Sequence, residues 1–419
     1  MIKKIILPIL LGSSIASASE VVFYSTQANP LKEADAMRND VLINYDGEVK
    51  FLPQEAGPFF SRIEAESRAN SVTLGVLGAL HGQFPQIQDS LDSIDDILGA
   101  VPDIKANKTM SDLGKLGTEN QKYIPWMQAT YIMAANKKAL PYLPEGADVY
   151  ALTYDELAVW ASNIKEATGD AKLGFPAGEK GLMHRFLQGY LYPSFTHSVV
   201  TEFRSDDAKD MWKWFRDLWQ DVNPRSTAYS LMQEPLLTEE VWVAFDHTAR
   251  LKDAFDQRPD DFIAFPAPSA KEGRGFMPVI AGLAIPKGTP DREGAASLIK
   301  YLSQPEVQVK TLKATGFYPI ANVELPADLP ANVRIAGKAI SQQAGSADAL
   351  PSMLPVGLGD LSGQFSKAYK DTFQQIVLRN ADIDSILNRQ AVVLKNIMST
   401  ANAPCWAPDK PSEGVCPVN

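Results

Sequence analysis

The sequence predicts an α/β protein built from two lobes. A chain of 419 residues is longer than one hydrophobic core usually serves, so two lobes are expected. Short β-branched or apolar runs alternate with helical patterns from residue 20 onward, which indicates a mostly parallel sheet. Residues 276–320 repeat this alternation as strand, turn, helix, capped helix and strand. The hydrophobic content of 45% and charged content of 21% are typical of a soluble globular chain.

The first 18 residues have the pattern of a cleaved secretion signal. Lys3 and Lys4 precede an apolar core at 5–15, and small residues occupy 16–18. The apolar core is far shorter than the roughly 20 residues that a membrane span needs. No cysteine stands at the cleavage point, which excludes a lipoprotein anchor. We therefore predict cleavage before Ser19 and a periplasmic protein.

The next segments predict the first sheet. Strands are expected at 20–25, 49–53 and 72–80, with helices at 31–38, 59–69 and 90–98. Ligands of parallel sheets bind beyond the carboxyl ends of the strands. Gln27, Glu55 and His81 follow three predicted strands and are candidate binding residues for that reason.

The middle of the chain starts with a long extended run at 124–136. Thr153 and Glu156 have the spacing of a capping box for a helix that buries Leu157, Trp160, Ala161 and Ile164. A strand at 173–175, a helix at 182–192, a helix at 206–222 capped by Ser205 and a strand at 240–245 follow. The loop 246–250 leaves this last strand.

The segment 276–320 is the most informative. Residues 278–285 form an apolar run that contains Gly282, and 286–288 form a turn. Thr289 is expected to cap a helix that has Pro290 at its first position. Ser303 and Glu306 predict a capping box for a second helix, which Gly316 ends. Helices at 362–378 and 383–398 complete the chain.

Three motifs in this segment, IPKGT at 285–289, KYLS at 300–303 and PEVQ at 305–308, resemble family 1 extracellular solute-binding proteins. These are the maltose-binding-protein-like, sugar-binding components of ABC importers. The run 124–136 resembles the family's crossing between lobes, with Ala135 where the family usually has tyrosine. The resemblance implies a two-lobed periplasmic binding protein-like fold, with a ligand cleft between lobes and a hinge of several crossings. The expected lobes are 19–130 with 283–330, and 131–278 with 331–400, followed by a tail at 401–419.

The resemblance implies a binding protein that is not an enzyme, has no cofactor or metal, and acts as a monomer. Its partners would be a small sugar or sugar derivative and the membrane permease. Metalloprotease, dinucleotide, P-loop and serine-hydrolase motifs are absent from the sequence. The net charge of −10 argues against a nucleic-acid ligand. A secreted carbohydrate-active enzyme is the alternative. A ferric-ion binder of similar fold is a further one, although the paired tyrosines that ligate iron are missing.

Sugar recognition needs aromatic faces and charged or amide hydrogen-bond partners. The candidate substrate-binding residues are Gln27, Glu55, His81, Trp126, Glu179, Asp246, His247, Arg250 and Tyr318. Each has a structural alternative: Trp126 could pack at the hinge, His81 could be a buried histidine, and Asp246 could pair only with Arg250. Because Arg250 is basic, an acidic sugar is also a candidate ligand.

Both cysteines, Cys405 and Cys416, lie in the Pro-rich tail. In an oxidising compartment a pair this close is expected to form a disulfide. A metal site is the alternative, but two thiols without a nearby histidine supply too few ligands.

Overall fold

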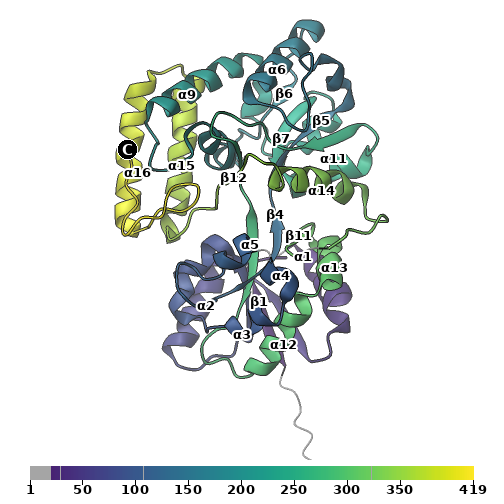
Figure 1. Ribbon diagram of the computed structural model, residues 1–419, viewed down its shortest axis with the longest axis vertical. Coiled ribbons are helices and arrows are strands. Elements are labelled where there is room, and N and C mark those ends of the chain that lie inside the picture. Colours follow the sequence, from purple (N-terminus) through teal and green to yellow (C-terminus); the bar gives the residue numbers. More distant parts are fainter. Residues whose placement is uncertain (1–19, 29, 107, 322) are drawn as a thin grey trace, which may run out of the picture.

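The computed structural model describes residues 20–28, 30–106, 108–321 and 323–419. The chain forms two α/β lobes joined by long strands at the centre of the molecule (Figure 1). The predicted signal peptide, residues 1–18, and the cleavage point before Ser19 lie outside the described residues. The two-lobed fold class predicted from the sequence is confirmed.

The first lobe contains a six-stranded mixed sheet in the order β11-β4-β10-β3-β1-β2. Its strands are β1 (Val21–Ser25), β2 (Val49–Pro53), β3 (Val76–Leu80), β4 (Ile124–Ala129), β10 (Val279–Ala284) and β11 (Tyr318–Pro319). β2 and β3 both pair with β1 in parallel, so the ends of these three strands lie at one edge of the sheet. β10 runs antiparallel between β3 and β4.

The second lobe contains a four-stranded sheet in the order β6-β7-β5-β8. Its strands are β5 (Tyr131–Asn136), β6 (Leu173–Gly174), β7 (Val243–His247) and β8 (Phe262–Phe265). β6 is parallel to β7, while β5 is antiparallel to β7 and to β8. A separate two-stranded sheet pairs β9 (Arg274–Phe276) with β12 (Ala349–Pro351).

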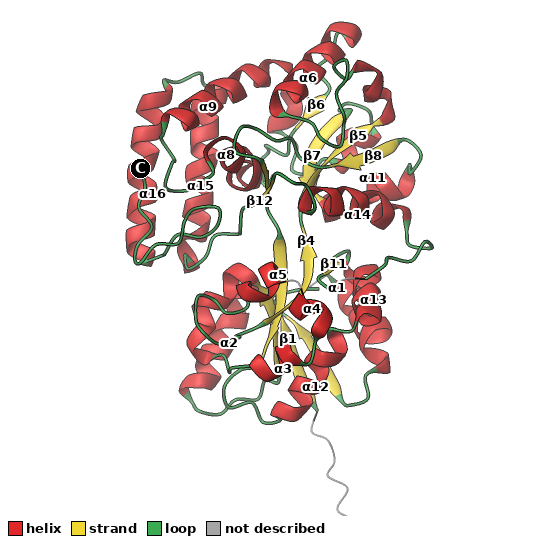
Figure 2. Cartoon of the chain, viewed as in Figure 1, coloured by secondary structure: helices red, strands yellow, loops and turns green. Residues whose placement is uncertain are grey.

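Helices cover both sheets, as the red ribbons of Figure 2 show. Those of the first lobe are α1 (Leu31–Ala36), α2 (Ala56–Arg68), α3 (Asp95–Gly99), α4 (Pro102–Ala106), α5 (Lys108–Leu113), α12 (Arg292–Leu302) and α13 (Pro305–Thr315). Those of the second lobe are α6 (Tyr154–Thr168), α7 (Met183–Phe186), α8 (Tyr192–Thr196), α9 (Asp206–Leu218), α10 (Gln233–Leu237), α11 (Lys252–Gln257), α14 (Ala331–Ala344), α15 (Ser362–Phe373) and α16 (Ile383–Ala401). None of the described helices is long and apolar enough to cross a membrane.

The crossings between the lobes are bonded to one another. Thr130, between β4 and β5, donates its hydroxyl hydrogen to the carbonyl of Met277, between β9 and β10, at 2.9 Å. At the third crossing the Tyr318 hydroxyl donates to the carbonyl of Val333 in α14 at 2.9 Å. These bonds tie segments far apart in sequence at the junction where the two lobes meet.

Helix caps test the local predictions. Thr153 and Glu156 form the predicted capping box of α6, and Leu157, Trp160, Ala161 and Ile164 are buried as expected. Ser205 caps α9 through the Ala208 amide, as predicted. Gly316 ends α13 in the left-handed conformation, also as predicted.

Two other predicted caps are wrong. Thr289 donates its hydroxyl hydrogen to the Leu74 carbonyl at 3.0 Å, and Asp291 caps α12 instead by accepting from the Gly294 amide. α13 starts at Pro305 after Gln304 and has no side-chain cap among the described residues, and Ser303 is buried. The acidic helix expected at 90–98 is also displaced, because α3 begins only at Asp95 and residues 81–90 form 3-10 turns. At these positions contacts with residues distant in the sequence, and not the local sequence pattern, decide where the helix begins.

The C-terminal tail packs against the second lobe. Cys405 and Cys416 form the predicted disulfide. The buried carboxylate of Asp409 accepts hydrogen bonds from the backbone amides of Val199, Val200 and Thr201 at 2.8, 3.0 and 2.8 Å. Trp406 packs edge-on against Phe365 of α15. The tail is therefore part of the second lobe's core.

Candidate ligand-binding cleft

A cavity of about 490 Å³ lies between the two lobes. The first lobe contributes the start of α2 and the turn after β3, including Phe60, Gly82 and Gln83. The second lobe contributes Arg185 and residues 354–366, including Asp360. This volume is in the range of small-molecule sites, and the lining comes from both lobes.

Polar side chains are organised on the first-lobe side. Gln27 donates through Nε2 to the Thr26 hydroxyl at 2.9 Å, and Thr26 donates to Oε1 of Gln83 at 2.8 Å. Oε1 of Gln83 also accepts the Leu80 amide at 2.9 Å. This network joins the ends of β1 and β3 and holds Gln83 at the cavity wall. Glu55 is exposed at the end of β2, directly before α2.

Three cations lie together on the second-lobe side. Arg250, just after β7, reaches the carbonyls of Ser230 at 2.7 Å and Lys180 at 3.4 Å. Lys370 of α15 reaches the neighbouring carbonyl of Glu179 at 3.3 Å. Arg185 of α7, which packs against α15, lines the cavity and reaches the Gln188 amide oxygen at 3.3 Å. Arg185, Arg250 and Lys370, which we call the cleft cations, are all half-buried.

The two histidines beside the cleft cations are neutral at physiological pH. Burial lowers the pKa of His184 to about 2, and the positive charges of the cleft cations add to the shift. Burial and the charge of Arg250 lower the pKa of His247 to about 4. Nδ1 of His184 has no hydrogen-bond partner among the described residues.

Asp246 faces the protein interior. It lies within β7, not in the outgoing loop expected from the sequence, and its side chain is 0% exposed. Its carboxylate accepts the Met232 amide at 2.9 Å and the His247 amide at 2.8 Å. Burial raises the pKa of this carboxyl to about 7, against the lowering effect of these amides and of Arg250. The carboxylate holds local backbone in place and does not pair with Arg250 by contact.

Three further candidates are also held by the protein itself. His81 is buried with Nδ1 at 2.7 Å from the Tyr123 hydroxyl. The Trp126 indole donates to the Leu302 carbonyl at 3.0 Å and is 4% exposed, although it shares a small cavity with Gln27. Tyr318 lies at the third crossing, on a second interlobe cavity of about 590 Å³ between α1, α13 and the second lobe. Glu179, by contrast, is exposed beside the cleft cations.

The structure therefore brings Glu179, His247 and Arg250 together on the second-lobe side of the cleft and places Gln27 on the first-lobe side. It adds three residues to the candidate site, namely Gln83, Arg185 and Lys370. Sequence reasoning missed these three, because they lie in helical segments or turns with no motif. Within the described ranges, no group of three or more His, Cys, Asp or Glu residues could hold a metal ion.

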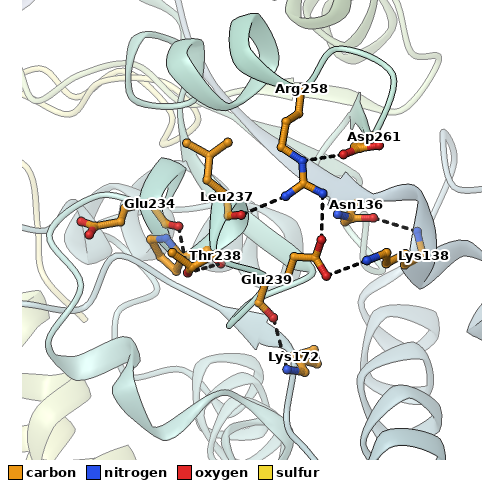
Figure 3. Close-up of polar contacts among 10 residues, drawn as sticks. Asn136, Lys138, Lys172, Glu234, Leu237, Thr238, Glu239, Arg258 and Asp261 are labelled. Atoms are coloured by element: carbon orange, nitrogen blue, oxygen red, sulfur yellow. Dashed lines mark hydrogen bonds and ion pairs between the residues drawn. The ribbon is translucent and has the colours of Figure 1, made fainter.

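Several cations outside the cleft are paired with carboxylates. Arg258 contacts Glu239 at 2.7 Å and Asp261 at 2.5 Å, and Glu239 also contacts Lys138 at 2.6 Å (Figure 3). None of the three cleft cations forms an ion pair within 4.0 Å in the part of the chain that the structure describes.

Two α/β lobes, three crossings and a cavity between strand-end loops define the class of two-lobed periplasmic binding proteins. The sequence profile described as bacterial extracellular solute-binding protein matches residues 39–336. The chain belongs to this family. A search among curated proteins gave no significant match.

Solved structures share the fold at low identity. The sugar-binding protein MalE from Xanthomonas citri has a TM-score of 0.73 and 14% identity, over 91% of this chain and 98% of its own. UgpB from Mycobacterium tuberculosis, solved with glycerophosphocholine, has a TM-score of 0.67 and 17% identity, over 91% and 99%. The GacH receptor of Streptomyces glaucescens, solved with acarbose, has a TM-score of 0.66 and 15% identity, over 91% and 99%.

Proposed function

We propose that this protein binds a sugar or sugar derivative in the interlobe cavity outside the cytoplasmic membrane and delivers it to the permease of an ABC importer. The observation that carries the proposal is the cavity of about 490 Å³ whose walls come from both lobes. Amide groups such as Gln83 and the exposed carboxylate of Glu55 supply the hydrogen-bond partners that hydroxyl groups need. The sugar ligands of MalE and GacH support the same class of ligand.

A ligand that contacts both lobes favours the closed arrangement, because only that state makes both sets of contacts. We propose that residues 19–130 with 283–330 move as one body and 131–278 with 331–400 as the other. Sheet membership supports the division: β4 ends at Ala129 in one sheet and β5 begins at Tyr131 in the other, and β10 joins the first-lobe sheet from Val279. The permease would recognise the closed form of the protein.

Calorimetric titration of the mature protein with neutral, acidic and phosphorylated mono- and disaccharides tests this function. We expect saturable one-to-one binding by at least one sugar, with no change in the sugar recovered afterwards. Small-angle scattering should show a smaller radius of gyration at saturation. Conversion of the sugar to product would favour the enzyme alternative, and absence of binding across all three sugar classes would contradict the proposal.

Delivery to a permease requires the protein to be exported. We propose that it is a periplasmic monomer cleaved before Ser19. Intact mass spectrometry of the periplasmic fraction should give the mass that begins at this residue, lowered by two hydrogens for the Cys405–Cys416 bond. A retained N-terminus in a membrane fraction would contradict the localisation.

A further inference from the structure

We propose that the ligand carries an anionic group, a carboxylate or a phosphate, which Arg185, Arg250 and Lys370 bind on the second-lobe side of the cleft. This inference rests on the proposed function, because it assigns a chemical class to the ligand of the same cavity. Arg185 lines the cavity, and Arg250 and Lys370 contact the loop that precedes its helix, in a chain whose net charge is −10.

The first argument is the position of the three side chains. The carbonyl oxygens that Arg250 and Lys370 contact belong to consecutive residues, Lys180 and Glu179, so the two charges converge on one turn of backbone. Arg185 follows the same loop and faces the cavity. Ser366, one helical turn before Lys370, also lines the cavity, so this face of α15 is turned toward it.

The second argument is charge balance. The groups to which the cleft cations donate hydrogen bonds are neutral: backbone carbonyls and the Gln188 amide oxygen. The ionisable groups near them are His184, His247, Asp246 and Glu179, and the carboxylate of Asp360 lines the same cavity as Arg185. His184 and His247 are neutral, Asp246 is buried on backbone amides, and Glu179 is exposed without an ion pair to Lys370 among the described residues. Arg185 lines the cavity, as Asp360 does, and Arg250 and Lys370 bring two further positive charges to the carbonyls of Lys180 and Glu179 beside it.

The third argument is the electrostatic repulsion between the three positive charges. Like charges that approach one another in a partly dehydrated cleft repel, and the repulsion is stronger than in bulk water. Partial burial lowers the pKa of Lys370, and the positive charges of Arg185 and Arg250 lower it further, against the raising effect of the Glu179 carboxylate. An anionic ligand removes this repulsion and accepts charge-assisted hydrogen bonds, for which the arginine fork and the lysine ammonium are suited.

A matched set of probes separates the contribution of the anion from that of the sugar ring. Glucose, glucuronate and glucose 6-phosphate share one ring and differ in charge, and inorganic phosphate tests the anion alone. Each is titrated by calorimetry into the mature protein, beside variants Arg185→Gln, Arg250→Gln and Lys370→Gln. Lys367→Gln is the control, because Lys367 lies on the same helix and is paired with Asp371 at 2.5 Å.

We expect glucuronate or glucose 6-phosphate to bind at least tenfold tighter than glucose, and added salt to weaken this binding. Each cleft-cation variant should lose about 10- to 150-fold in affinity for that anion, as expected for one charged hydrogen-bond partner, while Lys367→Gln stays within twofold. The melting temperature of ligand-free Lys370→Gln should be unchanged or higher, because repulsion is relieved. That second readout separates ligand binding from a merely structural role.

Tighter binding of glucose than of both charged hexoses would overturn the inference and leave the proposed function intact. A lower melting temperature with unchanged anion affinity in Lys370→Gln would also overturn it. Binding of inorganic phosphate but of neither charged hexose would keep the anion site and count against a sugar ligand. Binding of none of the four probes would overturn the inference, whereas the proposed function fails only if the wider sugar panel is also negative.

Discussion

The ammonium group of Lys370 lies 3.3 Å from the backbone carbonyl oxygen of Glu179, across 191 residues of sequence. This bond ties α15 to the loop that precedes α7, and it places the lysine charge beside Arg250, which contacts the next carbonyl of that loop. The second-lobe side of the cleft is therefore assembled from three separate chain segments.

Replacement of Asp246 by alanine should destabilise the fold. The change removes the acceptor of the Met232 and His247 amides within the protein interior, and a buried donor without a partner costs roughly 1–3 kcal/mol. We expect the free energy of unfolding in urea to fall by about 2–4 kcal/mol in Asp246→Ala, and by less in Asp246→Asn, which keeps one oxygen acceptor. Equal stability of Asp246→Ala and the wild type would contradict the structural role.

The same carboxyl predicts a pH dependence. Its folded pKa of about 7 lies above the ordinary aspartate value, so the folded state holds more protons between these limits. Its contribution to stability is present at low pH and is lost as the pH rises through 7. The stability of Asp246→Asn relative to wild type should therefore increase from pH 5 to pH 8. A constant difference over this range would show that the carboxyl does not titrate there.

The pH dependence of stability expected from His81 has the opposite sign. Burial lowers its pKa to about 4, so between this value and the ordinary 6.5 the unfolded state binds more protons. The stabilising contribution is complete above pH 6.5 and is lost as the pH falls. Wild type should lose about 2 kcal/mol more than His81→Gln between pH 6.5 and pH 5. Denaturant titrations at the two pH values measure this, and parallel losses in the two proteins would be the contrary result.

Asp409→Ala should release the C-terminal tail. Three backbone amides of residues 199–201 and the hydroxyls of Ser198 and Thr201 converge on this carboxylate. Charged hydrogen bonds contribute about 1.5–3 kcal/mol each, although such values do not add fully. We expect a loss of about 3 kcal/mol or more in unfolding free energy and proteolytic cleavage within residues 401–419. Glu413 is an exposed carboxylate in the same tail, so Glu413→Ala serves as the control and should change neither measurement. An Asp409→Ala protein as stable and as protease-resistant as the control would contradict the anchoring role.

Sequence reasoning predicted those features that depend on neighbouring residues. The caps Thr153 and Ser205 and the glycine end at Gly316 are set within one helical turn. Thr289 was predicted as a cap by the same rule, but Leu74, 215 residues away, offers its hydroxyl another partner. Local signals therefore give the element but not always the residue that begins it.

The candidate site was predicted less well, because polarity does not reveal which way a side chain points. Asp246, His81 and Trp126 follow or join predicted strands, yet each is buried against protein partners. Arg185 and Lys370 lie far apart in the sequence and meet only through the packing of α7 on α15. Only a three-dimensional arrangement can bring such residues into one candidate site.

The central claim is that one small anionic ligand is held between the lobes, and a crystal structure of the mature protein with the tightest-binding probe tests it most directly. The account predicts the anionic group about 3 Å from Lys370 Nζ and from at least one of the two arginine side chains. It also predicts contact between the rest of the ligand and first-lobe residues such as Gln83. A ligand enclosed by one lobe alone, or an anionic group turned away from the three cations, would contradict the account.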